Sequence, residues 1–193
     1  MTASATQLRG TKVLLREKRI ADASDDYAWS IDRELSRLDA AHPLTLSFNS
    51  ALALYEEEIM FPQPRRMRFG IDTLDGAHIG NCMYYDINEA KGEAELGIMI
   101  GDRRYWGKGY GTDAVATLLR YIFTQTGLKR VYLHTLDWNA RAQKSFVKAG
   151  FTPKGTVRKN GHSFIFMEIS RQEWEHAPGK RASEGAERRH QSK

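Results

Sequence analysis

The sequence has a single cysteine and no apolar run long enough to cross a membrane. The lone thiol, Cys82, excludes a disulfide within the chain, and a chain without disulfides is expected in the reducing cytoplasm. No segment approaches the roughly 20 apolar residues of a membrane span, and the start of the chain contains no apolar signal core. We therefore expect a cytoplasmic protein that has no membrane partner.

Positive charge is in only modest excess, and much of it lies near the C-terminus. The formal net charge is +5, and residues 178–193 contribute +3 of it through five Lys or Arg and two Glu. The remaining 177 residues carry +2, which does not by itself predict a nucleic-acid partner. We expect one domain over residues 1–177 and a basic, polar, disordered tail over residues 178–193.

Hydrophobic periodicity predicts a mixed sheet with helices packed against it, which is an α/β chain of the α+β type. Helices are expected over residues 21–35, with Asp22 and Ser24 as candidate N-caps, and over 47–60, 113–123 and 139–149. Strands are expected over residues 11–17, 94–101 and 128–136, and hairpins are expected around Asp75-Gly76 and Asn160-Gly161.

The stretch RRYWGKGYGT, residues 103–112, joins an expected strand to an expected helix and contains three alternate glycines. A Walker A loop needs Ser or Thr after its Gly-Lys pair, but Gly109 follows Lys108. A dinucleotide fingerprint needs a third glycine where Thr112 stands. The pattern that remains is R-x-x-G-x-G, beginning at Arg104.

This pattern suits a pyrophosphate. Glycines let backbone N–H groups approach an anion closely, and the free N–H groups at a helix N-terminus favour negative charge. Arg103, Arg104 and Lys108 add positive charge around the turn.

Two longer segments carry a family resemblance. ELGIMIGDRRYWGKGYGTDAVATLLRYIF and LKRVYLHTLDWNARAQKSFVKAGF resemble the acyl-CoA-binding core of the GNAT N-acetyltransferases, most nearly the RimJ and RimL branch, with spermidine acetyltransferases nearby. The resemblance is strongest over residues 93–152. It implies a GNAT fold, in which a mostly antiparallel sheet flanked by helices splays apart between the strands at about 94–100 and 130–136.

The resemblance also implies acetyl-CoA as co-substrate and no metal. The pyrophosphate of acetyl-CoA would lie on the backbone of residues 106–111, and its pantetheine arm would lie between the splayed strands, where Gly97 suits a bulge. Asn139 matches a family residue that contacts this arm, although it also suits a helix N-cap. The expected cofactor-binding residues are Ile98, Met99, Ile100, Arg103, Arg104, Trp106, Gly107, Lys108, Gly109, Tyr110, Gly111, Thr112, Asn139, Lys144, Phe146 and Lys148. Lys144 and Lys148 either reach the phosphates or face solvent.

Amide formation from a thioester needs a base for the amine and a donor for the developing oxyanion. Glu93 and Glu95 share one face of their strand and are candidate bases, with Glu95 the first choice. His134 is a third candidate, because histidine changes charge near neutral pH. A backbone N–H near Ile98 or Met99 is expected to meet the oxyanion.

The usual acids of the resembled family are missing. Phe146 stands where many members have a tyrosine that reaches the CoA sulfur, and Ala142 stands where members like RimL have a serine. Ser145 is an adjacent candidate, but the helix turns it about 100° from position 146. Water remains able to protonate the thiolate.

The sequence thus predicts an acetyl-CoA-dependent N-acetyltransferase that acts by direct transfer to a primary amine. A protein N-terminus is the first acceptor, followed by polyamines, amino-acid-like metabolites and amine antibiotics. The alternative is a non-catalytic acyl-CoA-binding or sensor module of the same fold. Nucleic-acid binding through the tail is a weaker hypothesis, and a homodimer stays open.

Overall fold

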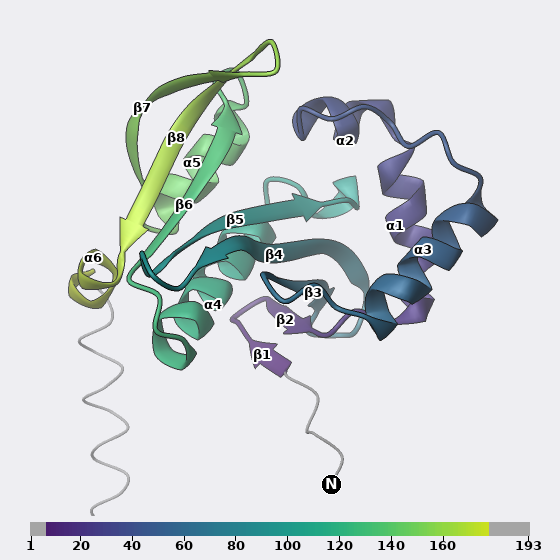
Figure 1. Cartoon of the computed structure of the whole chain (residues 1–193), viewed down its shortest axis with the longest axis horizontal. Helices are drawn as coiled ribbons and strands as arrows, with labels where there is room; N and C mark the ends of the chain where they lie inside the picture. Colours follow the sequence, from purple (N-terminus) through teal and green to yellow (C-terminus); the bar gives the residue numbers. More distant parts are fainter. Residues whose placement is uncertain (1–6, 178–193) are drawn as a thin grey trace, which may run out of the picture.

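The computed structural model describes residues 7–177, so the expected tail at 178–193 lies outside the described residues. Eight strands form one sheet in the order β1-β2-β3-β4-β5-β6-β8-β7 (Figure 1). The strands are β1 Gln7–Arg9, β2 Val13–Arg16, β3 Arg66–Thr73, β4 His78–Asn88, β5 Glu93–Ile100, β6 Arg130–Leu136, β7 Thr152–Lys159 and β8 His162–Ser170.

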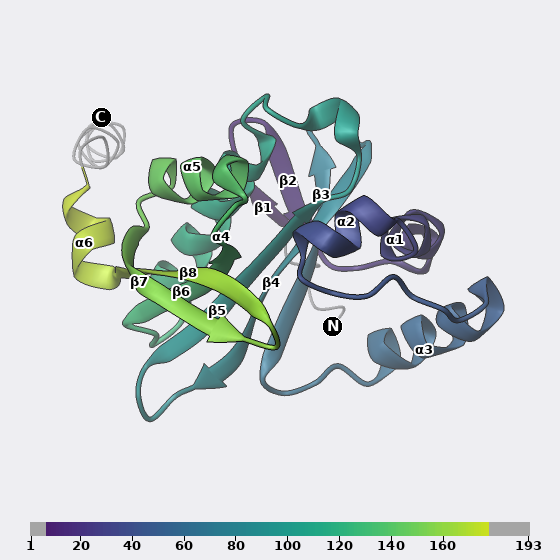
Figure 2. The ribbon, with the colours of Figure 1, turned by 90° about the horizontal axis from the view of Figure 1, so that it is seen from above.

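Helices cover both faces of the sheet. Figure 2 shows α4 and α5 on one side and α1 to α3 on the other. The helices are α1 Ala23–Ser30, α2 Arg33–Leu38, α3 Phe48–Met60, α4 Tyr110–Gln125, α5 Ala140–Lys148 and α6 Arg171–His176, with 3-10 turns η1 Ile20–Asp22 and η2 Arg103–Tyr105. Across residues 7–177 no helix is both long and apolar enough to span a bilayer, and no cluster of side chains suited to a metal ion occurs.

The sheet splays between β5 and β6, as the family resemblance implies. These two strands are parallel, and their pairing covers only Glu93–Glu95 against Arg130–Tyr132. In the described structure β5 then runs on to Ile100 and β6 to Leu136 without further pairing between them. All other neighbouring strands pair antiparallel. Figure 1 shows the β6–β8–β7 arm diverging from β5.

Helix α4 holds the two halves of the sheet together through its apolar face. Val115, Leu118, Leu119 and Ile122 are each at most 1% exposed, so the face expected from their spacing is confirmed. They join a core cluster that contains side chains from both β5 and β6. Burying an aliphatic side chain of this size contributes about 1.5–3 kcal/mol relative to leaving it in water.

The helix expected over residues 21–35 is wrong as a single element. It divides into α1 and α2, because Asp32 adopts extended backbone (φ −73°, ψ 120°) and its carboxylate accepts hydrogen bonds from the N–H groups of Glu34 and Leu35. Asp22 precedes α1 without capping it through its side chain, and Ser24 lies inside α1.

A buried ion-pair network explains why Asp22 is not free to cap. Arg16 on β2 is 4% exposed, and it donates to Asp72 of β3 and to Asp22 at 2.7 and 2.6 Å. Burial would raise the pKa of Asp22, but the hydrogen bonds from Arg16 and from the Arg19 N–H reverse this effect and lower it. The network fixes the start of α1 on the sheet.

The bulge expected at Gly97 is not there. Gly97 pairs regularly with Met83, and the irregularity lies on the neighbouring strand between Tyr85 and Asn88. Asp86 in that segment has a positive φ of 50°. The kink beside the splay therefore belongs to β4.

Both expected hairpins are confirmed. Gly76 has φ 96° in the first, and Asn160 and Gly161 have φ 49° and 78° in the second, which is the left-handed pair of a type I′ turn. Strand β1, turn η2 and helix α6 were not expected from the hydrophobic periodicity.

One carboxylate anchors the first turn of α4. Asp113 accepts from the Thr11 hydroxyl at 2.8 Å and from the backbone N–H groups of Thr11, Lys12 and Val13 at 2.7–3.1 Å. Burial opposes its ionisation, but these hydrogen bonds lower the pKa of Asp113 below its ordinary value. The turn before β2 is thereby tied to the helix N-terminus.

We predict that Asp113→Asn lowers the free energy of unfolding by about 2 kcal/mol at pH 7, since an amide replaces a charged acceptor of several hydrogen bonds. The pKa is depressed in the folded state, so this stability is present above the unfolded value and is lost as the pH falls through the folded one. Urea unfolding at pH 7 and at pH 3 measures the effect. Glu89→Gln, at an exposed position, is the control, and equal midpoints for Asp113→Asn and wild type at pH 7 would contradict the prediction.

Candidate functional site

A cavity of about 500 Å³ opens where β5 leaves β6. Its walls come from the end of β5, the glycine-rich turn, the start of α4, the face of α5 and the short helix α2. Of the residues expected to bind a cofactor, those that line it are Ile98, Met99, Ile100, Trp106, Gly107, Gly109, Gly111, Thr112, Asn139, Lys144, Phe146 and Lys148. The cavity thus gathers residues from distant parts of the chain at one place.

The glycine turn has the backbone that an anion cradle requires. Gly107 and Gly109 have φ values of 70° and 86°, a region that side chains with a Cβ rarely adopt. A Cβ on Gly107 would meet no atom within 4 Å, so the space beside the turn is open. The first N–H groups of α4, which follows at once, have no intrahelical partner. These features fit a pyrophosphate.

Trp106 holds the turn against the strand. Its indole Nε1–H donates to the carbonyl oxygen of Ile100 at 2.6 Å, and the Arg141 guanidinium lies 3.5 Å from its ring centroid. Tyr110 does not line the cavity, because it packs edge-on against Tyr105 beside the core.

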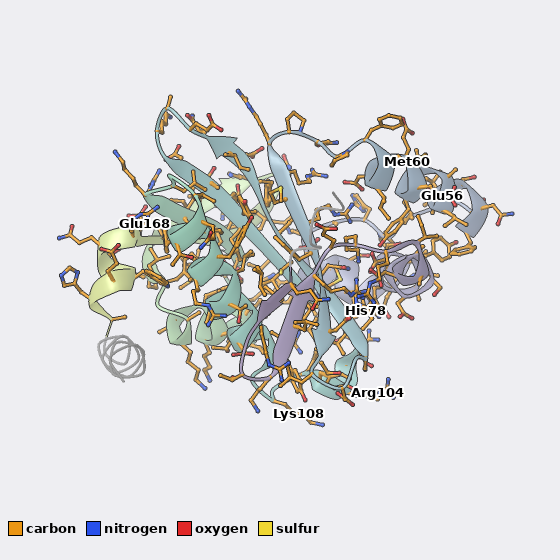
Figure 3. The ribbon with its side chains drawn as sticks, turned by 90° about the horizontal axis from the view of Figure 1, so that it is seen from below. Glu56, Met60, His78, Arg104, Lys108 and Glu168 are labelled. Carbon is orange, nitrogen blue, oxygen red and sulfur yellow. The ribbon has the colours of Figure 1, made fainter. Side chains whose placement is uncertain are left out.

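Two of the expected phosphate-binding cations are engaged elsewhere. Arg103 pairs with Asp32 and Glu34 at 2.8 and 2.9 Å, so it joins the turn to α2. Arg104 pairs with Asp102 at 2.6 Å, and its side chain is 82% exposed. Figure 3 shows Arg104 and Lys108 at the periphery of the molecule, and neither lines the cavity.

The positive charge on the cavity wall comes instead from α5. Lys144 and Lys148 line the cavity, and Arg141 joins them. No local sequence pattern marks Arg141, because only the packing of α5 beside the glycine turn brings it to the cavity. Burial lowers the pKa of Arg141 and the charge of Glu34 opposes that shift.

The start of α5 contributes polar groups. Asn139 caps the helix through its Oδ1, which accepts from the Ala142 N–H at 3.2 Å, and it also lines the cavity. Ser145 lines the cavity beside Phe146, and its hydroxyl lies 2.8 Å from that of Thr112. The helical turn between positions 145 and 146 therefore does not remove Ser145 from the cavity.

Glu95 and His134 form a pair on the opposite face of the sheet from the core. The Nδ1 atom of His134 lies 2.8 Å from a carboxylate oxygen of Glu95, and both side chains are largely buried. Two of the sequence's candidate bases are thus brought together across the parallel strands.

Glu93 is placed differently. It pairs with Arg130, which also binds Glu168 on β8 at 2.6 Å. This arrangement makes Glu93 part of an ion-pair ladder at the paired end of β5 and β6, where the strands have not yet separated.

Aromatic rings surround the Glu95–His134 pair. The His134 ring lies 5.3, 6.0 and 6.3 Å from the ring centroids of Phe166, Tyr132 and Phe164. Burial, followed by the charge of Glu95 and a hydrogen bond with it, raises the pKa of Tyr85. Together these groups make a carboxylate-bearing aromatic surface, which is suited to an organic cation.

The wall formed by α2 was not foreseen from the sequence. Leu35, Leu38 and Asp39 line the cavity from this helix, opposite α5. Nothing in the local pattern of residues 33–39 marks them, because the helix reaches the cavity only through the break at Asp32 and the long-range pairing with Arg103.

Comparisons with known proteins agree with this geometry. A family model described as "Acetyltransferase (GNAT) domain" matches residues 12–152. The uncharacterized N-acetyltransferase p20 of Bacillus licheniformis is 34% identical over 149 residues, which cover 76% of this chain and 83% of that protein. The spermine/spermidine N(1)-acetyltransferase of Bacillus subtilis is 28% identical over 100 residues, covering 49% of this chain and 66% of that protein.

Solved structures show the same fold. The spermidine N-acetyltransferase of Vibrio cholerae, in complex with CoA and spermine, superposes with a TM-score of 0.74 at 23% identity and covers 84% of this chain and 97% of that one. An aminoglycoside acetyltransferase in complex with coenzyme A gives a TM-score of 0.72 at 22% identity, with coverages of 86% and 98%.

We predict that Gly109→Ala weakens acetyl-CoA binding about five- to thirtyfold, because a Cβ at φ 86° costs about 1–2 kcal/mol of backbone strain in the conformation that presents the N–H groups. Gly76→Ala is the matched control, since Gly76 has φ 96° with open space around it in a hairpin away from the cavity. Calorimetric titration should show reduced affinity in the first variant alone. Equal affinities in both variants would remove the anion-cradle role of the turn.

Proposed function

The chain belongs to the GNAT acetyltransferase family, and from that premise we propose that its cavity holds acetyl-CoA and that its acceptor is the free N-terminus of a protein or peptide. The family assignment makes it an acetyl-CoA-dependent N-acetyltransferase acting on an amine. The choice of acceptor follows the sequence resemblance to the RimJ and RimL branch, and we place the enzyme in the cytoplasm.

The observation that carries this proposal is the position of the glycine turn at the mouth of the splay. Residues 107–111 would hold the pyrophosphate, with Lys144, Lys148 and Arg141 of α5 beside it. The pantetheine arm would follow the edge of β5, where backbone groups beyond Glu95 are left without β6 partners in the described sheet. Such an edge suits the amide groups of a pantetheine chain.

The residues around the splay supply the requirements of acyl transfer. The acceptor amine forms a bond to the thioester carbon, and the carbon–sulfur bond breaks. An N–H of β5 near Ile98 or Met99 would stabilise the negative charge that develops on the carbonyl oxygen. Preorganised backbone donors of this kind are typically worth about 3–4 kcal/mol in the transition state.

Other amines remain candidates for the acceptor. The carboxylate and aromatic surface around Glu95 and His134 suits a polyamine or an aminocyclitol as well as a peptide N-terminus. Solved structures that share the fold with this chain hold spermine in one case and kanamycin in another.

One observation favours the alternative of a non-catalytic acyl-CoA-binding module. Phe146 lines the cavity without a hydroxyl, and Ala142 also lies on its wall, so neither usual acid is present. Ser145 is the hydroxyl on α5 adjacent to Phe146. Its hydrogen bond with the Thr112 hydroxyl holds it on the side of the cavity that would bind the cofactor.

The test is the release of CoA from acetyl-CoA, followed with a thiol reagent against separate pools of N-terminal peptides, polyamines, amino acids and aminoglycosides. Release above the rate without acceptor supports the enzyme, and the fastest pool identifies the acceptor class. Saturable acetyl-CoA binding with no release from any pool between pH 6 and 9 would support the binding module instead.

We predict that Phe146→Tyr raises kcat about tenfold, because a phenol at this position could protonate the departing thiolate, and general acid catalysis contributes roughly 10²–10⁴-fold. Phe146→Leu is the control, since it changes the ring without adding a hydroxyl. Steady-state kinetics at saturating acetyl-CoA measures the effect. An unchanged kcat in Phe146→Tyr would mean that thiolate protonation does not limit turnover.

A further inference from the structure

Transfer to an amine begins with an ammonium ion, which must lose a proton before its nitrogen can attack. The carboxylates of the sheet are already engaged: Glu95 bonds to His134 at 2.8 Å, and Glu93 pairs with Arg130. A group that receives the ammonium would be expected on the cavity wall with its oxygens free.

Asp39 meets these requirements. It lines the cavity at the end of α2, on the wall opposite α5, and it remains open to solvent. Within residues 7–177 its carboxylate takes part in no hydrogen bond or ion pair. It is thus a free acceptor at the entrance to the site.

The position of Asp39 is fixed by its surroundings. Its backbone N–H donates to the carbonyl oxygens of Leu35 and Ser36, both at 3.1 Å, which closes the helix end. The next residue, Ala40, has φ 52°, a conformation that costs about 1–2 kcal/mol for a residue with a Cβ. At the other end of α2, Asp32 is held by Arg103 at 2.8 Å. A short helix anchored at both ends can present a side chain in a constant direction.

The electrostatics of the wall agree with this position. Although the Asp39 side chain reaches solvent, the protein atoms crowded around it displace part of its water and raise its pKa to about 6, with no cation to offset the shift. The charge of Asp39 also contributes to raising the pKa of Tyr85, after burial and the effects of Glu95 and Asp86. The charges of Asp39 on α2 and Glu95 on β5 therefore both disfavour ionisation of the Tyr85 phenol.

Building on the proposed acetyl transfer, we propose that Asp39 binds the ammonium of the acceptor and takes its proton, on the wall of the cavity that faces α5. The ammonium gives one proton to the Asp39 carboxylate, which later passes it to water. The neutral nitrogen bonds to the thioester carbon as the carbon–sulfur bond breaks, and a second N–H proton ends on the sulfur of CoA. The products are the acetylated amine, CoA and one proton released to solvent.

The test compares Asp39→Asn with wild type, using a tetrapeptide with a free N-terminus and spermidine as parallel probes. We expect kcat/KM to fall about 100-fold, in the range of general base catalysis, while acetyl-CoA affinity by calorimetry stays unchanged. Asp39→Glu, which keeps the carboxylate, should recover most of the loss. Asp75→Asn is the matched control, because Asp75 is exposed in the hairpin between β3 and β4 and lies outside the cavity.

The pH profile separates a proton acceptor from a structural residue. The ratio of wild-type to Asp39→Asn kcat/KM cancels the titration of the acceptor itself, and it should rise through pH 6 to a plateau. Other titratable or charged groups on the surrounding elements are Tyr85 and Asp86 on β4, Glu95 on β5, His134 on β6, and Arg141 and Lys144 on α5.

The measurements distinguish failure of the proposed function from failure of the role of Asp39. Wild-type protein that binds acetyl-CoA without turning over any amine would overturn the proposed function. An active wild type with an unchanged Asp39→Asn variant would overturn the role of Asp39 alone. If the pH dependence of kcat/KM persists in Asp39→Asn and disappears in His134→Gln, the role of Asp39 is overturned and His134 is the base.

Discussion

The separation of β5 from β6 is the constraint on which the rest of the molecule depends. A parallel pair that continued past Glu95 and Tyr132 would close the sheet and leave no cavity. The opening leaves part of β5 and of β6 without a strand partner. Helix α4 keeps the two halves of the sheet together, because its buried face packs on both of them. The same helix begins at the glycine turn, so the element that holds the splay together also supplies the N-terminus at its mouth.

The cavity has two walls with different chemistry. The α5 wall carries Arg141, Lys144 and Lys148 and suits the phosphates of a cofactor, whereas the α2 wall carries Asp39 and suits a cation. The buried Arg16 network fixes α1 on the sheet, and the Arg103 pairs fix α2 to the glycine turn. A single arginine thus couples the cofactor side to the acceptor side, since it binds the helix that carries Asp39.

The elements that local pattern determines were predictable from the sequence. The face of α4, the Asn160-Gly161 turn and the glycine turn follow from spacing and backbone preference within a few residues. The role of Arg103 was not predictable, because Asp32 lies 71 positions away and only the fold brings the two together. Asp39 was missed for the same reason. A bulge was expected at Gly97 on β5, but the irregularity lies on the neighbouring strand β4. A glycine in a strand indicates a kink nearby without showing which of the two paired strands contains it.

The most direct test of this account is a crystal structure of the protein with bound CoA. We expect the pyrophosphate against the backbone N–H groups of residues 107–111, the pantetheine arm between β5 and β6, and the sulfur within the space bounded by Phe146, Ile98 and Asp39. A pyrophosphate held by Arg104 and Lys108 outside the cavity, or a pantetheine arm that leaves the splay empty, would contradict it.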